Sequence, residues 1–192
     1  PPERFVFNLN LENINKLENS KKEPLMELIK IFASPIFFKT VTNEFKNIID
    51  KRIKNFTDYE INLLGKDKFK FYIQALLIKD FKKYQLGVHT DTTKKFLSFL
   101  FYLPKDENLI DLGTALYKLK KEIVNIDEKG NIHLPPDSTD EYFVLVKKIP
   151  FLPNSLFVFP RTNYSFHGVE KINSDQSERN LIVLNYFFKT KE

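Results

Sequence analysis

The spacing of apolar residues along this 192-residue chain changes near residue 69. In residues 1–68, apolar positions recur about every three to four residues, which places them on one face of a helix. In residues 69–192, short runs are apolar at every second position or throughout, as in half-buried and buried strands. The pattern predicts a mainly β chain of the α+β class, with a helical support region at residues 1–68 and a β core at residues 69–192.

Two helices are predicted in the first region. The first runs from Pro24 to Phe32, because proline is favoured in a first helical turn, and it ends before Pro35. A second, longer helix is predicted from Thr42 to Phe56, with Thr42 or Asn43 as its N-cap residue. Both helices have one apolar face that the β core could cover.

Seven strands are predicted in the second region, each bounded by turn-forming residues. Several short strands of this kind favour a sandwich or a barrel, and the length suits a single domain, residues 1–192. A polar segment at residues 122–139 is predicted to be a loop or a small hairpin. The strands are Phe69–Ile78, Tyr84–His89, Lys95–Leu103, Thr114–Leu119, Tyr142–Ile149, Ser155–Phe159 and Asn180–Phe188.

Composition removes several functional classes. The chain has no Cys, which excludes disulfides, thiolate zinc sites and cysteine nucleophiles; it also fits a reducing compartment, so we expect a cytoplasmic protein. No apolar stretch approaches the roughly 18 residues of a membrane span. The net charge is +5, but the 30 Lys and Arg are interleaved with 25 Asp and Glu, so a nucleic-acid surface is not expected.

Two of the three histidines carry the candidate chemistry. His89 and Asp91 lie two residues apart between two predicted strands, a spacing that puts both side chains on one face. His167 follows much later, after the apolar run that ends at Phe159. Two imidazoles and one carboxylate on one side of a metal leave coordination positions open, as in the facial triad of non-haem Fe(II) oxygenases. His133 lies in the polar loop and is predicted to have no metal role.

Arg179 is the second chemical feature, at the start of the last predicted strand. A 2-oxo acid chelates a metal through its 2-oxo group and C1 carboxylate, so the distal carboxylate of a dicarboxylic 2-oxo acid needs its own cation. A guanidinium suits a carboxylate because it offers a planar, two-pronged set of donors. His-x-Asp alone is a weak signal, but its combination with a distant His and an Arg beyond it is specific.

Residues 69–188 resemble the Fe(II)/2-oxoglutarate-dependent dioxygenase superfamily, in particular its bacterial and phage branch similar to prolyl 4-hydroxylases. The resemblance implies a double-stranded β-helix, the cupin-like jelly roll, with iron at one mouth. It also implies that His89, Asp91 and His167 are the metal ligands and that Arg179 binds the distal carboxylate of 2-oxoglutarate. The matching stretches are residues Leu86–Asp91, Phe99–Pro104, Gly113–Tyr117, Pro150–Asn154, Ser165–Glu170 and Glu178–Arg179.

One position departs from this family. Many members have Ser or Thr two residues after the arginine, where a hydroxyl shares the same carboxylate, but this chain has Leu181. Tyr84, on the strand that leads to His89, is the predicted second donor.

The resemblance implies a dioxygenase that uses O₂ to hydroxylate a peptidyl or small-molecule substrate, held by the loops at residues 105–111 and 122–139. The alternative is a cupin-like metal-binding jelly roll without oxygenase activity, or a zinc hydrolase on the same fold. Arg179 disfavours it, because a simple metal site needs no clamp for a dicarboxylic acid. A nucleic-acid demethylase is a third possibility, favoured only by the basic charge.

Overall fold

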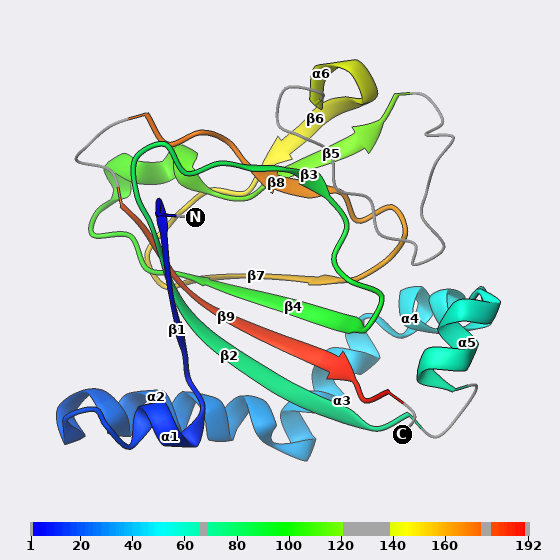
Figure 1. Ribbon diagram of the computed structural model, residues 1–192, viewed down its shortest axis with the longest axis horizontal. Coiled ribbons are helices and arrows are strands. Elements are labelled where there is room, and N and C mark those ends of the chain that lie inside the picture. The colour runs from blue at the N-terminus through cyan, green and yellow to red at the C-terminus, as the bar shows by residue number, and fades with distance from the viewer. Residues whose placement is uncertain (1, 66–68, 121–138, 174–177, 191–192) are drawn as a thin grey trace.

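The computed structural model describes residues 2–65, 69–120, 139–173 and 178–190. Its strands form two antiparallel sheets that face each other (Figure 1), one in the order β1-β2-β9-β4-β7 and the other in the order β3-β8-β5-β6. This arrangement confirms the predicted mainly β jelly roll. The first sheet contains β1 (Arg4–Asn8), β2 (Phe71–Asp80), β9 (Arg179–Phe188), β4 (Lys95–Tyr102) and β7 (Ser155–Pro160); the second contains β3 (Leu86–His89), β8 (His167–Val169), β5 (Ala115–Leu119) and β6 (Phe143–Lys148).

All seven predicted strands are present, with ends that differ by a few residues. The predicted helical region, however, opens with a strand, β1, which pairs antiparallel with β2 at the edge of the first sheet. Phe5 and Val6 on this strand are about half exposed. The apolar run in β1 is too short to show whether its period is that of a helix or of a strand. It forms a strand because it pairs with β2, more than sixty residues later in the chain.

Both helix predictions need correction at their boundaries. The first helix, α2, spans Asn19–Ala33 and contains Pro24 in its interior. A proline there removes one backbone hydrogen bond without stopping a helix whose residues on both sides favour it. The predicted second helix is divided into α3 (Pro35–Glu44) and α4 (Lys46–Lys54).

The predicted N-cap residue of that second helix is also wrong. Thr42 lies inside α3, where its hydroxyl donates to the Phe38 carbonyl at 2.8 Å, as serine and threonine often do within helices. Ser34 caps α3 instead, since its Oγ accepts from the Phe37 N–H. Two shorter helices, α1 (Leu11–Ile14) and α5 (Asp58–Leu64), complete the N-terminal layer.

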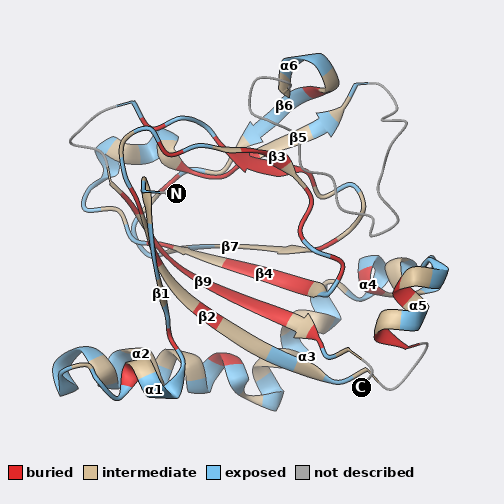
Figure 2. Cartoon of the chain, in the orientation of Figure 1, coloured by how far each residue is buried: buried red, intermediate tan, exposed pale blue. Residues whose placement is uncertain are grey.

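Side chains on the central strands of the first sheet, β2, β4 and β9, point alternately to its two faces, and both faces are covered there. One face of β2, β4 and β9 packs against the helices in a core that includes Ala75, Phe99 and Leu184. The hydroxyl of Tyr186 in that core donates to the carbonyl of Phe32 at the end of α2. The other face looks across to the second sheet. Figure 2 shows the buried residues along β4 and β9 and around β3.

Two short helices lie in the connections, η1 (Glu107–Leu112) and α6 (Thr139–Tyr142). The predicted loop at residues 105–111 is therefore largely 3₁₀-helical, with a kink at Leu109. The other predicted substrate loop, residues 122–139 with His133, lies outside the described residues except for Thr139, where α6 begins. None of the helices that the structure describes is long and apolar enough to cross a membrane.

Candidate metal centre

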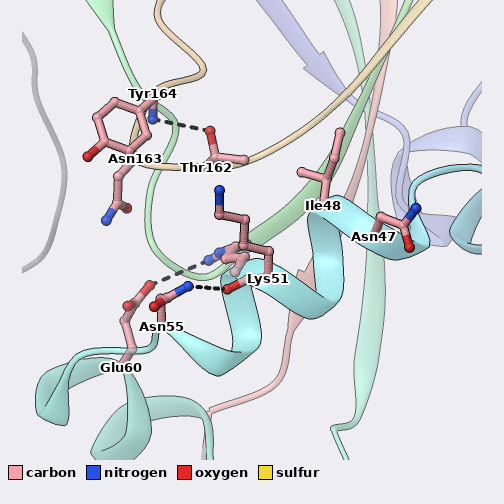
Figure 3. Close-up of a pocket in the computed structure, with 9 residues that line it drawn as sticks. Asn47, Ile48, Lys51, Asn55, Glu60, Thr162, Asn163 and Tyr164 are labelled. Atoms are coloured by element: carbon pink, nitrogen blue, oxygen red, sulfur yellow. Dashed lines mark hydrogen bonds and ion pairs between the residues drawn. The ribbon is translucent and has the colours of Figure 1, made fainter.

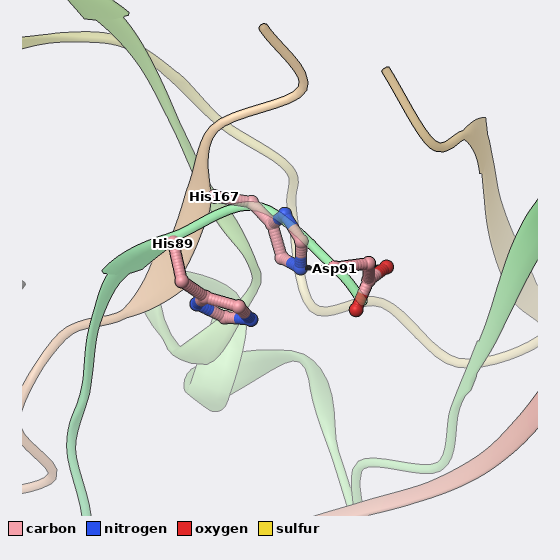
Figure 4. A group of neighbouring side chains, drawn as sticks. All are labelled: His89, Asp91 and His167. Carbon is pink, nitrogen blue, oxygen red and sulfur yellow. Dashed lines mark ion pairs between the residues drawn. The ribbon is translucent and has the colours of Figure 1, made fainter. Parts of the chain in front are cut away.

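His89, Asp91 and His167 converge at one end of the space between the sheets (Figure 4). His89 ends β3 and His167 begins β8, and the two residues are direct partners in the antiparallel pairing of these strands. Asp91 follows His89 by two residues. One ligand atom from each side chain can be chosen so that all three lie within 4.8 Å of one another. Asp91 and His167 are buried, and His89 is half-buried.

The close approach of β3 and β8 depends on Gly168. A Cβ atom on Gly168 would lie 2.7 Å from the carbonyl oxygen of Leu86 on the neighbouring strand. Real Cβ atoms do not come so near a backbone oxygen, so any side chain here would push β8 away from β3. The glycine after His167 therefore sets the spacing of the two histidines.

Both imidazoles are oriented by backbone carbonyl groups. Nδ1 of His89 lies 2.9 Å from the Gly87 oxygen, and Nδ1 of His167 lies 2.9 Å from the Ser165 oxygen. A carbonyl oxygen only accepts, so we assign the proton to Nδ1 in each ring. This tautomer carries its ring lone pair on Nε2, and it is a form in which histidine binds a metal.

The charge states of two ligands also suit metal binding. Burial lowers the pKa of His167, against the opposing effects of Asp91 and the Ser165 carbonyl, so the ring favours its neutral form. Burial alone would raise the pKa of Asp91, but Lys95, His167 and the hydrogen bonds from Lys95 and Ser98 outweigh it and lower this pKa to about 2. The site thus presents a neutral imidazole at His167 and an ionised carboxylate at Asp91, as a metal requires.

Asp91 is held by several neighbours. Its Oδ1 accepts from the Lys95 ammonium at 2.6 Å and its Oδ2 from the Ser98 hydroxyl at 2.9 Å. Its backbone oxygen accepts from Nε of the buried Arg161 at 3.2 Å. The Asp91 Oδ2 atom remains 4.0 Å from His167 Nε2, and Figure 4 draws this pair as a dashed line.

The donor set fits a divalent iron. Two imidazole nitrogens and one carboxylate oxygen form the ligand set typical of non-haem iron sites with open positions. In a facial set the ligands lie at about right angles to one another, so two ligand atoms bonded to one ion at about 2.1 Å lie about 3 Å apart. The widest separation here, 4.8 Å, therefore has to close by roughly 2 Å when an ion binds.

The three candidate ligands open into a cavity of about 300 Å³ between the sheets. Most of its floor comes from the inner face of the first sheet, with side chains such as Leu100, Leu181 and Val183. The Phe159 ring meets the His167 ring edge-on at a centroid distance of 4.7 Å. The exposed area of the walls is therefore mainly apolar, although about half of the lining residues are polar or charged, and pockets that bind small molecules combine the two in this way.

Arg179 lines the same cavity and is 2% exposed. Its Nη1 donates to Asp80 Oδ2 at 2.9 Å and its Nε to the Leu112 carbonyl at 2.7 Å. A longer contact of 3.4 Å joins its Nη2 to the Thr114 hydroxyl. The structure thus brings the predicted carboxylate binder and the candidate metal ligands to one cavity.

Tyr84 lies nearby in the turn before β3, and it is not among the described residues that line the cavity. It is buried against Val169 and Ile172, and the Arg4 guanidinium lies 4.0 Å above the centre of its ring. Burial raises the pKa of Tyr84 to about 12; Asp80 adds a smaller effect in the same direction, and Arg4 and Arg179 oppose it. Its predicted role as second carboxylate donor stays a prediction.

A second hollow, of about 730 Å³, lies between α4, α5 and the loop that precedes His167 (Figure 3). Buried Glu60 lies 3.7 Å from an Arg52 nitrogen and 3.5 Å from an Arg161 nitrogen. Burial and then the neighbouring Arg161 lower the pKa of Arg52 to about 9, against the effect of Glu60. Arg52 also donates to the backbone oxygens of Thr93 and Lys95, so this cluster ties the N-terminal helices to the loop after Asp91.

Four polar residues around the cavity have no role assigned from sequence alone: Arg4, Asp80, Lys95 and Ser98. Lys95 and Ser98 lie in β4, four and seven residues after Asp91. The turn between Asp91 and β4 brings their side chains back to the Asp91 carboxylate. Arg4 and Asp80 belong to strands whose register is not visible in the sequence. A predicted pairing of β2 with both β1 and β9 would have found them.

Comparison with known proteins supports the fold. No protein-family model matches the sequence, and no curated protein matches it. Among solved structures, a 2OG-Fe(II) oxygenase family oxidoreductase from Burkholderia pseudomallei aligns over 96% of this chain and 68% of its own, with 11% identity and a TM-score of 0.51. This chain thus shares its fold with a solved protein of the family that the sequence resembles.

Two further structures align with lower scores. A prolyl-4-hydroxylase from Pseudomonas putida has a TM-score of 0.45 and 11% identity, over 98% of this chain and 73% of its own. The dioxygenase for auxin oxidation 1 from Arabidopsis thaliana, in complex with 2-oxoglutarate, has a TM-score of 0.45 and 15% identity, over 100% of this chain and 64% of its own.

Proposed function

We propose that this chain is a non-haem Fe(II) and 2-oxoglutarate-dependent dioxygenase that hydroxylates a peptidyl or small-molecule substrate. One observation carries the proposal: the His89, Asp91 and His167 side chains and the buried cation of Arg179 line a single cavity. A metal ligand set that leaves positions open and a separate guanidinium meet the two needs of a chelating dicarboxylic 2-oxo acid.

His89, Asp91 and His167 would hold the iron. When bound, iron supplies the coupled activation of O₂ and oxidative decarboxylation of 2-oxoglutarate to succinate and CO₂ that oxidises the substrate. The Gly87 and Ser165 carbonyls keep the two histidines in the ligating tautomer, and Ser98 keeps the Asp91 carboxylate turned toward the site.

The remaining residues of the cavity would position the co-substrate. Arg179 offers its guanidinium to the distal carboxylate, which fixes the direction in which the 2-oxo group reaches the metal. The apolar side chains of Leu100, Leu181 and Val183 exclude water from the chain of the acid, and in such surroundings each charge-assisted hydrogen bond is stronger than in water.

The alternative is a cupin-like metal-binding jelly roll without oxygenase activity. That protein would need the three ligands but no guanidinium in the same cavity. The guanidinium of Arg179 in the same cavity therefore favours the oxygenase. Its buried partner Asp80 also pairs with Arg4, so one positive charge remains for an acidic ligand.

Succinate release tests this function. Purified protein is incubated with Fe(II), 2-oxoglutarate and O₂, first alone and then with a panel of proline-containing peptides, free amino acids and other small molecules. We expect slow succinate formation without substrate, faster formation with the right substrate, and none in a His167→Ala variant. Metal binding without any 2-oxoglutarate binding or consumption would support the cupin-like alternative instead.

A further inference from the structure

Arg4, Asp80 and Arg179 form a row across three neighbouring strands. Arg4 on β1 is the direct partner of Asp80 on β2, and Asp80 is the direct partner of Arg179 on β9. Directly paired residues of antiparallel strands point to the same face of the sheet. Here that face looks into the cavity, and both arginines line it.

The two guanidinium groups share one carboxylate. Arg4 donates to Asp80 through Nε at 2.5 Å and through Nη2 at 2.9 Å, and Arg179 donates to Asp80 Oδ2 at 2.9 Å. The Asp80 side chain is completely buried, the Arg179 side chain is 2% exposed and the Arg4 side chain is 20% exposed. Two positive charges and one negative charge are thus enclosed together, which leaves one positive charge unbalanced.

Unused donors accompany this excess charge. Hydrogen bonds among the described residues use two of the five N–H groups of Arg4 and three of those of Arg179. An unbalanced cation with free donors in a mainly apolar cavity is unfavourable unless an anion joins it. A carboxylate suits the place, since it has two oxygens and can accept from both arginines.

We infer that Arg4, on the N-terminal edge strand, binds the distal carboxylate of the 2-oxo acid together with Arg179. Asp80 positions both guanidiniums and offsets their mutual repulsion. Tyr84 positions Arg4 from beneath, through the cation–π contact at 4.0 Å. The inference rests on the proposed function, and it supplies a second donor where the family's Ser or Thr is replaced by Leu181.

The test compares two ligands that differ only at the far end. Calorimetry measures the binding of 2-oxoglutarate and of 2-oxopentanoate to Mn(II)-loaded protein. The second acid has the same carbon chain and the same chelating end but no distal carboxylate. A group that contacts this carboxylate affects only the first ligand, whereas a group with a general structural role affects both.

In an Arg4→Gln variant we expect 2-oxoglutarate to bind about tenfold or more weakly, while 2-oxopentanoate binding changes less than about twofold. Arg4→Lys should show a smaller loss, because it keeps the charge without the planar set of donors. It also replaces the first variant if Arg4→Gln does not fold. Lys79→Gln is the matched control: it removes one positive charge beside Asp80, from a lysine that pairs with Glu178, and should bind both acids as the wild type does.

Two results would overturn the inference. One is unchanged 2-oxoglutarate affinity in both Arg4 variants, and the other is an equal loss for the two acids. Either leaves the proposed function intact, provided that the wild type binds 2-oxoglutarate more tightly than 2-oxopentanoate. If the wild-type protein takes up Mn(II) but binds neither acid, the proposed function itself fails.

Discussion

His89 and His167, although far apart in the sequence, are directly paired across β3 and β8, and their ring centroids lie 4.3 Å apart. The two strands have only four and three residues. Their pairing alone brings the two imidazoles together, and Asp91 completes the set because it follows His89 by two residues. The geometry of the candidate metal site therefore depends on the local contact between β3 and β8.

Gly168→Ala should disturb that contact. The new Cβ would meet the Leu86 carbonyl oxygen at 2.7 Å, so β8 has to shift away from β3. We expect a loss of about 1–3 kcal/mol in the free energy of unfolding and at least a roughly tenfold loss in metal affinity. Chemical denaturation and metal titration measure the two effects. Wild-type metal affinity in this variant would show that the site does not depend on the spacing of these strands.

Lys95→Met should strengthen metal binding. The Lys95 ammonium lies 2.6 Å from Asp91 Oδ1, so it competes with a cation for the same carboxylate. Methionine keeps most of the apolar stem but removes the charge, and the expected gain in metal affinity is roughly tenfold. Lys94→Met, at the exposed neighbouring lysine, is the matched control and should leave the affinity unchanged. Weaker metal binding in Lys95→Met would mean that Lys95 mainly orients Asp91.

Arg179 variants should separate co-substrate binding from metal binding. Arg179→Ala is expected to weaken 2-oxoglutarate binding by at least about tenfold, because charge-assisted bonds contribute about 1.5–3 kcal/mol. Arg179→Lys should lose less, and the metal titration should change little in either variant. Thermal unfolding serves as the control, since Arg179 also holds Asp80 and the Leu112 carbonyl. If the alanine variant binds 2-oxoglutarate like the wild type, another cation holds the carboxylate.

Glu60→Gln should destabilise the whole molecule. Glu60 is the acidic partner of the buried Arg52 and Arg161, and its other oxygen accepts from the Thr57 N–H in the capping box of α5. Removing its charge takes from the buried Arg52 and Arg161 the carboxylate that they share, so we expect a loss of about 3 kcal/mol in the free energy of unfolding. Asp58→Asn, on the exposed side of α5, is the control and should lose less than about 1 kcal/mol. Equal stabilities of the two variants would contradict this role.

The strands of the core could be predicted because their signal is local. The nearly continuous apolar runs of β4 and β9 can be recognised without knowledge of a pairing partner, and His89-x-Asp91 lies within one short segment. The boundaries of the helices were harder to predict. Pro24 is tolerated inside α2, and the Thr42 hydroxyl bonds to a carbonyl within α3 rather than capping a helix. Proline and threonine each occur both at the start of a helix and inside one, so the residue type alone does not fix the boundary.

The part of the cavity that the sequence does not reveal depends on strand register. Arg4, Asp80 and Arg179 come together only because β1, β2 and β9 pair at those positions, and a shift of one residue would turn each side chain to the other face. The same holds for Lys95 and Ser98 at the Asp91 carboxylate. Residue types at chemically suggestive spacings could be found, but not the partners that set their charge and orientation.

Anaerobic absorption spectroscopy of the iron-loaded protein tests the central claim most directly. Fe(II) is added to the purified chain without O₂, and 2-oxoglutarate is then titrated in. We predict a metal-to-ligand charge-transfer band that saturates at one equivalent of 2-oxoglutarate and is absent in the His167→Ala variant, because chelation requires an iron held with open positions. No band in the wild type, or an unchanged band in His167→Ala, would contradict an iron and 2-oxoglutarate site at His89, Asp91 and His167.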